Sequence, residues 1–255
     1  MIELEHLTTQ TTTRHGDMSE HSIYSPSASA RWLQCPGSIK LSAKCPPQKT
    51  HASAEEGTHA HSLAEMCFKN SCKAHHFIGE LTPSGYLVNK TMAKHVQTYV
   101  DYVHQTKAQA GGELLIEQRL TLPNEPKVYG TGDAILLGDK SLHIFDFKYG
   151  KWVVNTKENT QLMIYALGAL DIYCRTKPEP ELISMHICQP RAKHKDGPNR
   201  MWNCSTSHLR LFALQVSAAV TESLKPEPEL NDGEHCRFCP AELICPKLNS
   251  LGRVL

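Results

Sequence analysis

The spacing of apolar and polar residues divides the chain into segments with helical periodicity and segments typical of strands. The predicted helices are a short one at 25–37 and longer ones at 54–69, 88–109, 157–175 and 207–224. The predicted strands are 113–122, 127–137, 141–149 and 182–190. The central order of helix, three strands, helix, strand and helix predicts an α/β fold, with a central mixed β-sheet flanked by helices.

This pattern also divides the chain into four regions. Residues 1–22 are rich in Thr, His and acidic residues without an apolar period, which predicts a disordered tail. A helical N-terminal region follows at 23–110, and the α/β core extends over 111–224. A Pro-rich hinge then leads into a Cys-rich end at 225–255. We expect the helical region and the core to form one domain.

Composition narrows the class of protein. Lys and Arg number 27 against 26 Asp and Glu, so a polyanionic partner would have to bind a local basic patch. The N-terminus shows no signal peptide, and no run of eighteen apolar residues occurs, which favours a soluble, cytoplasmic protein that does not enter a membrane. Ten cysteines without a secretion signal favour metal binding over disulfides for any clustered subset.

Two aspartates are predicted to meet on one face of the second and third strands. A tight turn centred on Asp139 and Lys140 would set a register that places Asp133 opposite Asp146. Directly opposed side chains lie roughly 4.5–5.5 Å apart, where two carboxylates repel unless a cation lies between them. Oxygen ligands of this kind suit Mg²⁺ or Mn²⁺. A three-residue loop would instead put the aspartates on opposite faces.

Lys148 lies on the same face as Asp146, because side chains two residues apart on a strand point the same way. The alternative interpretation of this pair is a simple ion pair on a solvated edge strand, which needs no metal. Gly130 and Gly132 favour the metal site, because glycine in a strand often marks the close approach of a ligand or another backbone.

Four sequence blocks and a cysteine pattern resemble the RecB-like branch of the PD-(D/E)xK nuclease superfamily. The similarity is strongest to phage-type RecB-like proteins, which are related to CRISPR-associated RecB-like exonucleases and to the AddB nuclease domain. The blocks, in order, are GTHAHSLAE with His61 and Glu65, GTGDAI with Asp133, DFKYGK with Asp146 and Lys148, and QLMIYALGAL with Gln161 and Tyr165. Asp146 replaces the glutamate of the common E-x-K form, an exchange that the superfamily allows.

The resemblance implies a restriction-endonuclease-like core at 111–224 and a metal-dependent DNA nuclease, an exonuclease, that serves DNA recombination or processing. The metal ligands for Mg²⁺ or Mn²⁺ would be His61, Asp133, Asp146 and the carbonyl of Phe147. Lys148 would hold or help deprotonate the attacking water, and Gln161 and Tyr165 would brace Lys148 or contact phosphate. Glu65 and Lys151 are expected to support this site. The alternatives are a surface histidine at His61, simple helix packing by Gln161 and Tyr165, and a non-catalytic DNA-binding or assembly module that retains the fold.

Four cysteines complete the resemblance. Cys236, Cys239 and Cys245 have the spacing C-x2-C-x5-C, and Cys35 lies in RWLQCPG near the start of the chain. In the similar families this arrangement holds a [4Fe–4S] cluster, which here would join the Cys-rich end to Cys35. Zinc is the competing ligand, and Cys45 is the alternative fourth cysteine. The remaining cysteines are expected to be small core residues, namely Cys67, Cys72, Cys174, Cys188 and Cys204.

A basic segment at 189–200 is a weaker candidate for DNA contact. Arg191, Lys193, Lys195 and Arg200 could contact phosphates, although a solvated loop would have the same composition. We see no stripe of aromatic residues suited to base stacking. The partners implied by the resemblance are DNA and a recombination or single-strand annealing protein, in the host cytoplasm if a phage encodes the chain. A homo-oligomer remains open.

Overall fold

The computed structural model describes residues 22–46, 52–250 and 252. The helices are η1 (Pro26–Ala28), α1 (Ser29–Trp32), α2 (Ser38–Ser42), α3 (Ala52–Asn70), η2 (Ala74–Phe77), α4 (Lys90–Ala110), α5 (Thr160–Cys174), α6 (Thr206–Leu224), η3 (Glu234–Phe238), η4 (Glu242–Ile244) and α7 (Pro246–Ser250). The strands are β1 (Glu113–Leu122), β2 (Glu125–Leu137), β3 (Ser141–Phe147), β4 (Leu182–Cys188) and β5 (Asn199–Cys204). The predicted α/β class is confirmed.

The five strands form one mixed sheet in the order β1-β2-β3-β4-β5. Neighbouring strands are antiparallel except β3 and β4, which are parallel. Parallel neighbours need a crossover connection, and α5 supplies it between β3 and β4. The β2–β3 register pairs Leu137 with Leu142 and continues to Ala134 with Phe145. This register confirms the tight turn predicted at Asp139.

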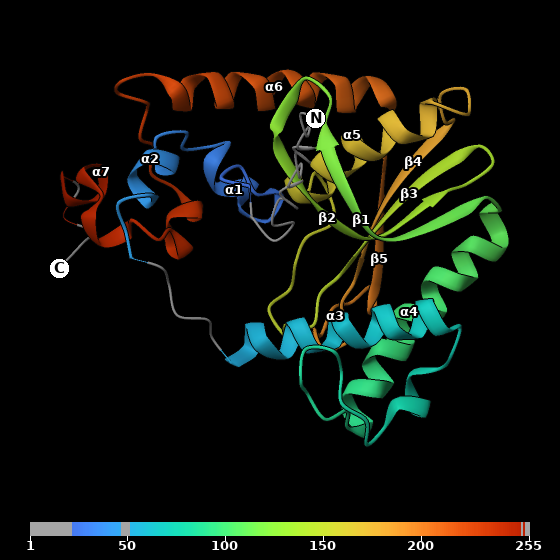
Figure 1. The fold of residues 1–255 in the computed structure, drawn as a ribbon. Helices are drawn as coiled ribbons and strands as arrows, with labels where there is room; N and C mark the ends of the chain where they lie inside the picture. The colour runs from blue at the N-terminus through green and yellow to red at the C-terminus, as the bar shows by residue number, and fades with distance from the viewer. Residues whose placement is uncertain (1–21, 47–51, 251, 253–255) are drawn as a thin grey trace, which may run out of the picture.

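Both faces of the sheet are covered (Figure 1). On β3, Leu142 and Ile144 point to a core shared with α5 and α6, whereas Phe145 and Phe147 point to a second core shared with α3 and α4. Alternate residues of a strand face opposite sides, so a strand that is buried on both faces is apolar throughout. The sheet is therefore the middle layer between two helical layers.

Side chains fix where the longer helices begin. Asn89 accepts a hydrogen bond from the backbone N–H of Met92 at the start of α4, and Asn159 accepts one from Leu162 at the start of α5. These bonds satisfy amide groups that have no partner within the helix. The cap at Asn159 matters for the site, because it sets where the first turn of α5 begins.

Some of the sequence predictions were wrong or fall outside the described residues. Residues 199–204 form the edge strand β5, although the sequence was interpreted as a basic loop as far as residue 200. Residues 1–21 of the predicted tail are not described, and Ser22 is buried and donates a hydrogen bond to the carbonyl of Lys127. Among the described residues, no helix has an apolar stretch long enough to span a bilayer.

The Cys-rich end lies against the N-terminal segment. The backbone N–H of Gly37 donates to the carbonyl of Glu229 at 2.8 Å, and Asn231 donates through its side chain to the carbonyl of Gln34 at 3.0 Å. A Cβ on Gly37 would lie 2.7 Å from that same Glu229 oxygen, so this close approach requires glycine. Figure 1 shows α2 beside α7 and the other C-terminal helices, apart from the sheet.

Candidate active site

The site lies where β2 and β3 separate. Their paired residues end at Ala134 and Phe145, and Asp133 and Asp146 are the next residues on the two strands. Beyond that point the Asp133 side chain replaces the backbone as acceptor, and its Oδ2 takes a hydrogen bond from the N–H of Phe147 at 2.7 Å. Extending the register by one residue places Asp133 opposite Asp146, as the sequence predicts.

Lys148 connects β3 to the first turn of α5. Its Nζ lies 3.0 Å from both carboxylate oxygens of Asp146 and donates to Oε1 of Gln161, also at 3.0 Å. The Gln161 amide in turn donates to the hydroxyl of Tyr165, one helical turn further along α5, at 3.4 Å. The four side chains predicted to act together therefore form one hydrogen-bonded chain.

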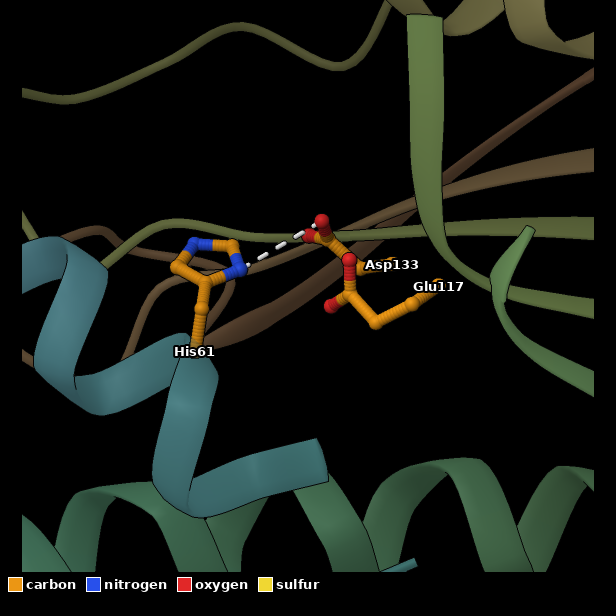
Figure 2. Close-up of side chains that lie close together, drawn as sticks. All are labelled: His61, Glu117 and Asp133. Carbon is orange, nitrogen blue, oxygen red and sulfur yellow. Dashed lines mark ion pairs between the residues drawn. The ribbon is translucent and has the colours of Figure 1, made fainter. Parts of the chain in front are cut away.

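A group of three potential metal ligands lies next to this chain. His61 of α3, Glu117 of β1 and Asp133 of β2 each offer a ligand atom, and these atoms lie within 4.8 Å of one another. Figure 2 shows the imidazole directed at the two carboxylates, with His61 Nδ1 3.3 Å from Asp133 Oδ1. One nitrogen and several carboxylate oxygens suit a hard divalent cation such as Mn²⁺ or Mg²⁺.

The charges of this cluster are strongly coupled. Burial alone would lower the pKa of His61, but the Asp133 carboxylate outweighs it and raises the pKa to about 9. Burial and the neighbouring Asp133 charge raise the pKa of Glu117 to about 7. For Lys148, burial again favours the neutral form, yet Asp146 and Asp133 hold its pKa above the ordinary value. Without a cation, His61 and Lys148 therefore carry the positive charge that balances the acids.

Asp146 is the most enclosed acid of the site. Its side chain is only 4% exposed, and burial raises its pKa although Lys148 opposes the shift. Oδ2 has no hydrogen-bond partner among the described residues, even though it lies close to Nζ of Lys148. A buried, unsatisfied carboxylate oxygen is costly, so this atom is suited to a ligand.

The other predicted site residues lie around this centre. The side chain of Phe147 is buried and stacks on Tyr99 with ring centroids 4.7 Å apart, on the opposite face of β3 from Asp146. Glu65 lies one helical turn after His61 and forms an ion pair with Lys69 at 2.5 Å. Lys151 is exposed, three residues after Lys148.

The two glycines before Asp133 lie against side chains of the protein. A Cβ on Gly130 would lie 2.9 Å from Pro26 and 3.1 Å from the Tyr165 ring, and one on Gly132 would lie 3.1 Å from two core side chains. The sequence suggested close approach of a ligand or another backbone. The structure instead shows close approach of side chains, and Gly130 leaves the space that the Tyr165 ring and Pro26 occupy.

The basic segment differs from its predicted role in part. Lys193 and Lys195 are exposed, as a phosphate contact requires. Arg191, in contrast, forms an ion pair with Glu56 at 2.6 Å and lies over the ring of Tyr149. Arg200 is buried in β5, where it donates to the carbonyl of Val154 and to Gln189, so its predicted contact with phosphate is wrong.

The four cysteines of the predicted cluster lie in the region where the N-terminal segment meets the C-terminal end. Cys35 and Cys245 are buried, and Cys236 and Cys239 are partly buried. Burial raises the pKa of Cys35, and the nearby thiols of Cys239 and Cys236 add to the rise. The N–H of Asn231 donates to Cys35 Sγ at 3.4 Å.

The remaining cysteines fit their predicted role only in part. Cys67 and Cys188 are buried in the core between the sheet and helices α3 and α4, as predicted. Cys174 is exposed at the end of α5, so its prediction as a core residue is wrong. Cys72 and Cys204 are partly buried, and Cys45 donates a weak hydrogen bond to the carbonyl of Leu41.

A groove of about 440 Å³ opens beside Lys148 and Gln161. One wall comes from the N-terminal segment, including Ser29 and Gln34, and the other from the segment 154–161. A second hollow of about 550 Å³ shares part of this second wall and extends to β5. The two hollows lead from Lys148 toward β5.

Glu117 is the site residue that sequence reasoning missed. The β1–β2 register pairs Ile116 with Ala134 and Gln118 with Gly132, which places Glu117 opposite Asp133. Its φ of 48° is unusual for a non-glycine residue and interrupts the regular strand there. The hairpin argument that placed Asp146 would have missed Glu117, because the β1–β2 register shifts between Thr121 and Leu122. Continued unchanged from the pair Leu122 and Glu125, the register would have placed Leu114 opposite Asp133.

A comparison with protein-family models shows which family the chain belongs to. Residues 21–251 match the family described as "Protein of unknown function (DUF2800)". The match covers most of the 255 residues, and the chain therefore belongs to this family.

Solved structures that resemble this chain include a candidate exonuclease and an alkaline exonuclease. A candidate exonuclease from Eubacterium rectale is 13% identical, with a TM-score of 0.47 over 92% of this chain and 93% of that chain. An alkaline exonuclease from Laribacter hongkongensis, LHK-Exo, is 11% identical, with a TM-score of 0.33 over 76% of this chain and 90% of that chain. Its complex with dAMP has the same TM-score at 12% identity, over 67% and 90% of the two chains.

Proposed function

We propose that this member of the DUF2800 family is a metal-dependent deoxyribonuclease that hydrolyses phosphodiester bonds in DNA, acting as an exonuclease. The observation that carries the proposal is the placement of His61, Glu117 and Asp133 as a possible metal group directly beside the Asp146–Lys148–Gln161 chain. A cation site next to a fixed lysine suits phosphodiester hydrolysis, because both groups stabilise the negative charge that develops on the phosphate. A role in recombination, with a recombination or annealing protein as partner, rests on the sequence resemblance alone.

The donor set fits a divalent cation. Asp133 and Glu117 offer carboxylate oxygens, His61 offers a nitrogen, and Asp146 of the next strand adds Oδ2, which accepts no hydrogen bond among the described residues. We infer that these four residues, together with the carbonyl of Phe147, hold Mg²⁺ or Mn²⁺. The bound cation would lower the pKa of a water molecule and neutralise charge on the phosphate.

Lys148 is proposed to position the reacting groups. Its raised pKa keeps the ammonium protonated at neutral pH, so it donates hydrogen bonds instead of accepting a proton. Asp146 and Gln161 occupy two of its directions at 3.0 Å, and the groove lies beside it. We infer that the third N–H holds the attacking water or a phosphate oxygen, where its charge stabilises the transition state.

Gln161 and Tyr165 are proposed to fix the direction of Lys148. Burial raises the pKa of Tyr165, so its hydroxyl stays neutral and accepts the hydrogen bond from the Gln161 amide. That bond orients Oε1 of Gln161 toward Lys148. These residues therefore act through Lys148 as positioning residues.

The test is degradation of end-labelled linear DNA with Mg²⁺ or Mn²⁺. We expect the wild-type protein to cut, and both Asp146→Asn and Lys148→Ala to lower the rate by about a hundred-fold or more while the proteins stay folded. Covalently closed circular DNA should resist an exonuclease. Asp139→Asn and Lys140→Ala, at the exposed turn of the same hairpin, are the matched controls and should keep full activity.

Two results would contradict the proposal. Full activity in both Asp146→Asn and Lys148→Ala would separate the cleavage from this site. A wild-type protein that binds DNA but does not cut it with either metal would instead support a non-catalytic DNA-binding module.

Cys35, Cys236, Cys239 and Cys245 are proposed to hold a [4Fe–4S] cluster, with zinc as the competing metal. The support is that Cys35 lies close to Cys236 and Cys239 and receives a backbone N–H on its sulfur, as cluster thiolates commonly do. The role would be structural, because the cluster would join the two ends of the chain.

The metal is identified by analysis of an anaerobic preparation. We expect a brown protein with stoichiometric iron and sulfide, and loss of both in Cys236→Ser. Cys174→Ser, at an exposed cysteine on α5, is the control and should keep them. A colourless protein with stoichiometric zinc would contradict the cluster and support a zinc site.

A further inference from the structure

Two of the most exposed aromatic side chains lie near each other beyond the active site. Trp152 follows β3 and is 81% exposed, and Phe238 lies in η3 of the Cys-rich end and is 82% exposed. Large aromatic residues are usually buried, because each removes a large apolar area from water on folding. Their joint exposure requires an explanation outside the fold.

A guanidinium group connects the two rings. The Cζ of Arg237 lies 5.6 Å from the centre of the Trp152 ring and 5.4 Å from the centre of the Phe238 ring. Arg237 is exposed as well. The three side chains thus form a surface with two aromatic rings and a cation. This combination suits a nucleic acid, whose bases stack on aromatic rings and whose phosphates are anionic.

The buried side chain of Gln189 holds the loop that carries Trp152 in place. The buried Gln189 donates through its side-chain amide to the carbonyls of Gly150 and Trp152, at 3.0 and 2.6 Å. Its Oε1 accepts from the N–H of Val154 and from the buried guanidinium of Arg200. An exposed tryptophan on a fixed backbone is preorganised for binding, because little conformational entropy is lost.

The surface adjoins the groove beside Lys148. Trp152 is four residues after Lys148, and the exposed Lys151 lies between them. Val154, which the same Gln189 network holds, lines the groove that opens at Lys148. A DNA strand with one phosphate at Lys148 would therefore have positive charge and exposed aromatic rings next to it.

We propose that Trp152, Arg237 and Phe238 form a base-stacking platform for a single-stranded segment of DNA beside the active site. The proposal rests on the proposed nuclease function for the identity of its ligand. The charge of Arg237 and the proximity of Lys148 favour nucleic acid over an apolar protein segment, for which a cation between the rings would be unfavourable.

The test is binding of a fluorescently labelled oligothymidylate of about 16 nucleotides, in EDTA so that no cleavage occurs. We expect Trp152→Ala and Phe238→Ala each to weaken binding by about five-fold or more, which is the smallest effect typical of one stacked base. Trp152→Phe and Phe238→Tyr retain a flat ring and should bind nearly as the wild type does. Leu214→Ala, at an exposed apolar residue of α6, is the control and should have no effect.

Tryptophan fluorescence gives a second measurement. Trp32 is buried, and Trp202 is partly buried at the second hollow, so most of the quenching by the oligonucleotide is expected to come from Trp152. Trp152→Phe should remove most of the quenching while binding persists. Undiminished quenching in Trp152→Phe would overturn the proposal.

The remaining outcomes separate the two proposals. Alanine variants that bind as tightly as the wild type, or a wild-type protein that does not bind the oligonucleotide, would overturn the platform. Alanine variants that bind normally but change the oligomeric state would identify a protein interface instead. If the wild type binds through these residues but never cuts DNA with Mg²⁺ or Mn²⁺, the platform stands and the nuclease function is contradicted.

Discussion

A buried pair of histidines predicts how the stability of this protein depends on pH. His143 of β3 and His186 of β4 share a hydrogen bond of 3.0 Å between their rings. Ser141 bonds to the outer nitrogen of His143 at 2.9 Å, and the hydroxyl of Tyr102 bonds to that of His186 at 2.8 Å. Burial lowers the pKa of His143 to about 4, and burial together with His143 lowers the pKa of His186 to about 3.

Both histidines therefore stay neutral in the folded protein but take up protons in the unfolded chain below about pH 6.5. Their contribution to stability is complete above that pH and is lost as the pH falls toward the folded-state values. A pH of about 5 lies roughly 1.5 units below the pKa of histidine in the unfolded chain, so protonation of each histidine stabilises the unfolded state by about 2 kcal/mol. The pair should thus lower the free energy of unfolding by about 4 kcal/mol, a large share of a typical 5–15 kcal/mol.

Urea unfolding at about pH 7.5 and about pH 5 measures this loss. Between the two pH values, we expect the free energy of unfolding to fall by about 4 kcal/mol less in the double variant His143→Gln, His186→Gln than in the wild type. The matched control is His75→Gln, His76→Gln, which replaces two exposed histidines whose rings also lie in contact. If the wild type and the buried double variant show the same pH dependence, the buried pair is not its source.

Four further substitutions test other parts of the structure. Glu117→Gln should weaken Mn²⁺ binding by about ten-fold or more in calorimetry, because it removes a carboxylate charge from the metal group. Gly112→Ala should lower stability by more than about 2 kcal/mol, since φ is +79° and the new Cβ would lie 2.0 Å from a carbonyl oxygen of β2. Gly85→Ala, at φ +83° in open space, should cost only about 1 kcal/mol. Gln189→Leu should cost about 3 kcal/mol in urea unfolding, because it removes the side-chain acceptor of buried Arg200 and the donor to the carbonyls of Gly150 and Trp152.

Local patterns in the sequence were sufficient to predict most of the core. The strand at 113–122 was predicted with the bounds that β1 has, because Gly111 and Gly112 precede its apolar residues and Pro123 and Asn124 follow them. The register of the β2–β3 hairpin followed from the two-residue turn alone, and it brought Asp133 and Asp146 together. Residues adjacent across a tight turn are positioned by local geometry, which sequence reasoning captures.

Features that depend on distant segments were not predicted. The strand β5 has polar and charged residues and is a strand because β4 offers it an edge. The stacking surface was missed for a similar reason: Trp152 and Phe238 are far apart in the sequence and no local pattern relates them. In the sequence, Arg200 resembles a surface cation because it lies in a basic segment. Its burial and its hydrogen bond to Gln189 cannot be read from the sequence.

The contact between the N-terminal segment and the Cys-rich end has a consequence for how the protein is made. Gln34, which lines the groove beside Lys148, hydrogen-bonds to Asn231 and His235, about 200 residues later in the chain. Synthesis of that length takes about 10 to 40 s at typical rates, so the nascent chain exposes Gln34 without its partners for that time. The groove wall is therefore completed late in translation, after the sheet strands have emerged. A ribosome-bound chain that stops before Asn231 would carry the acidic cluster and Lys148 but lack the finished groove.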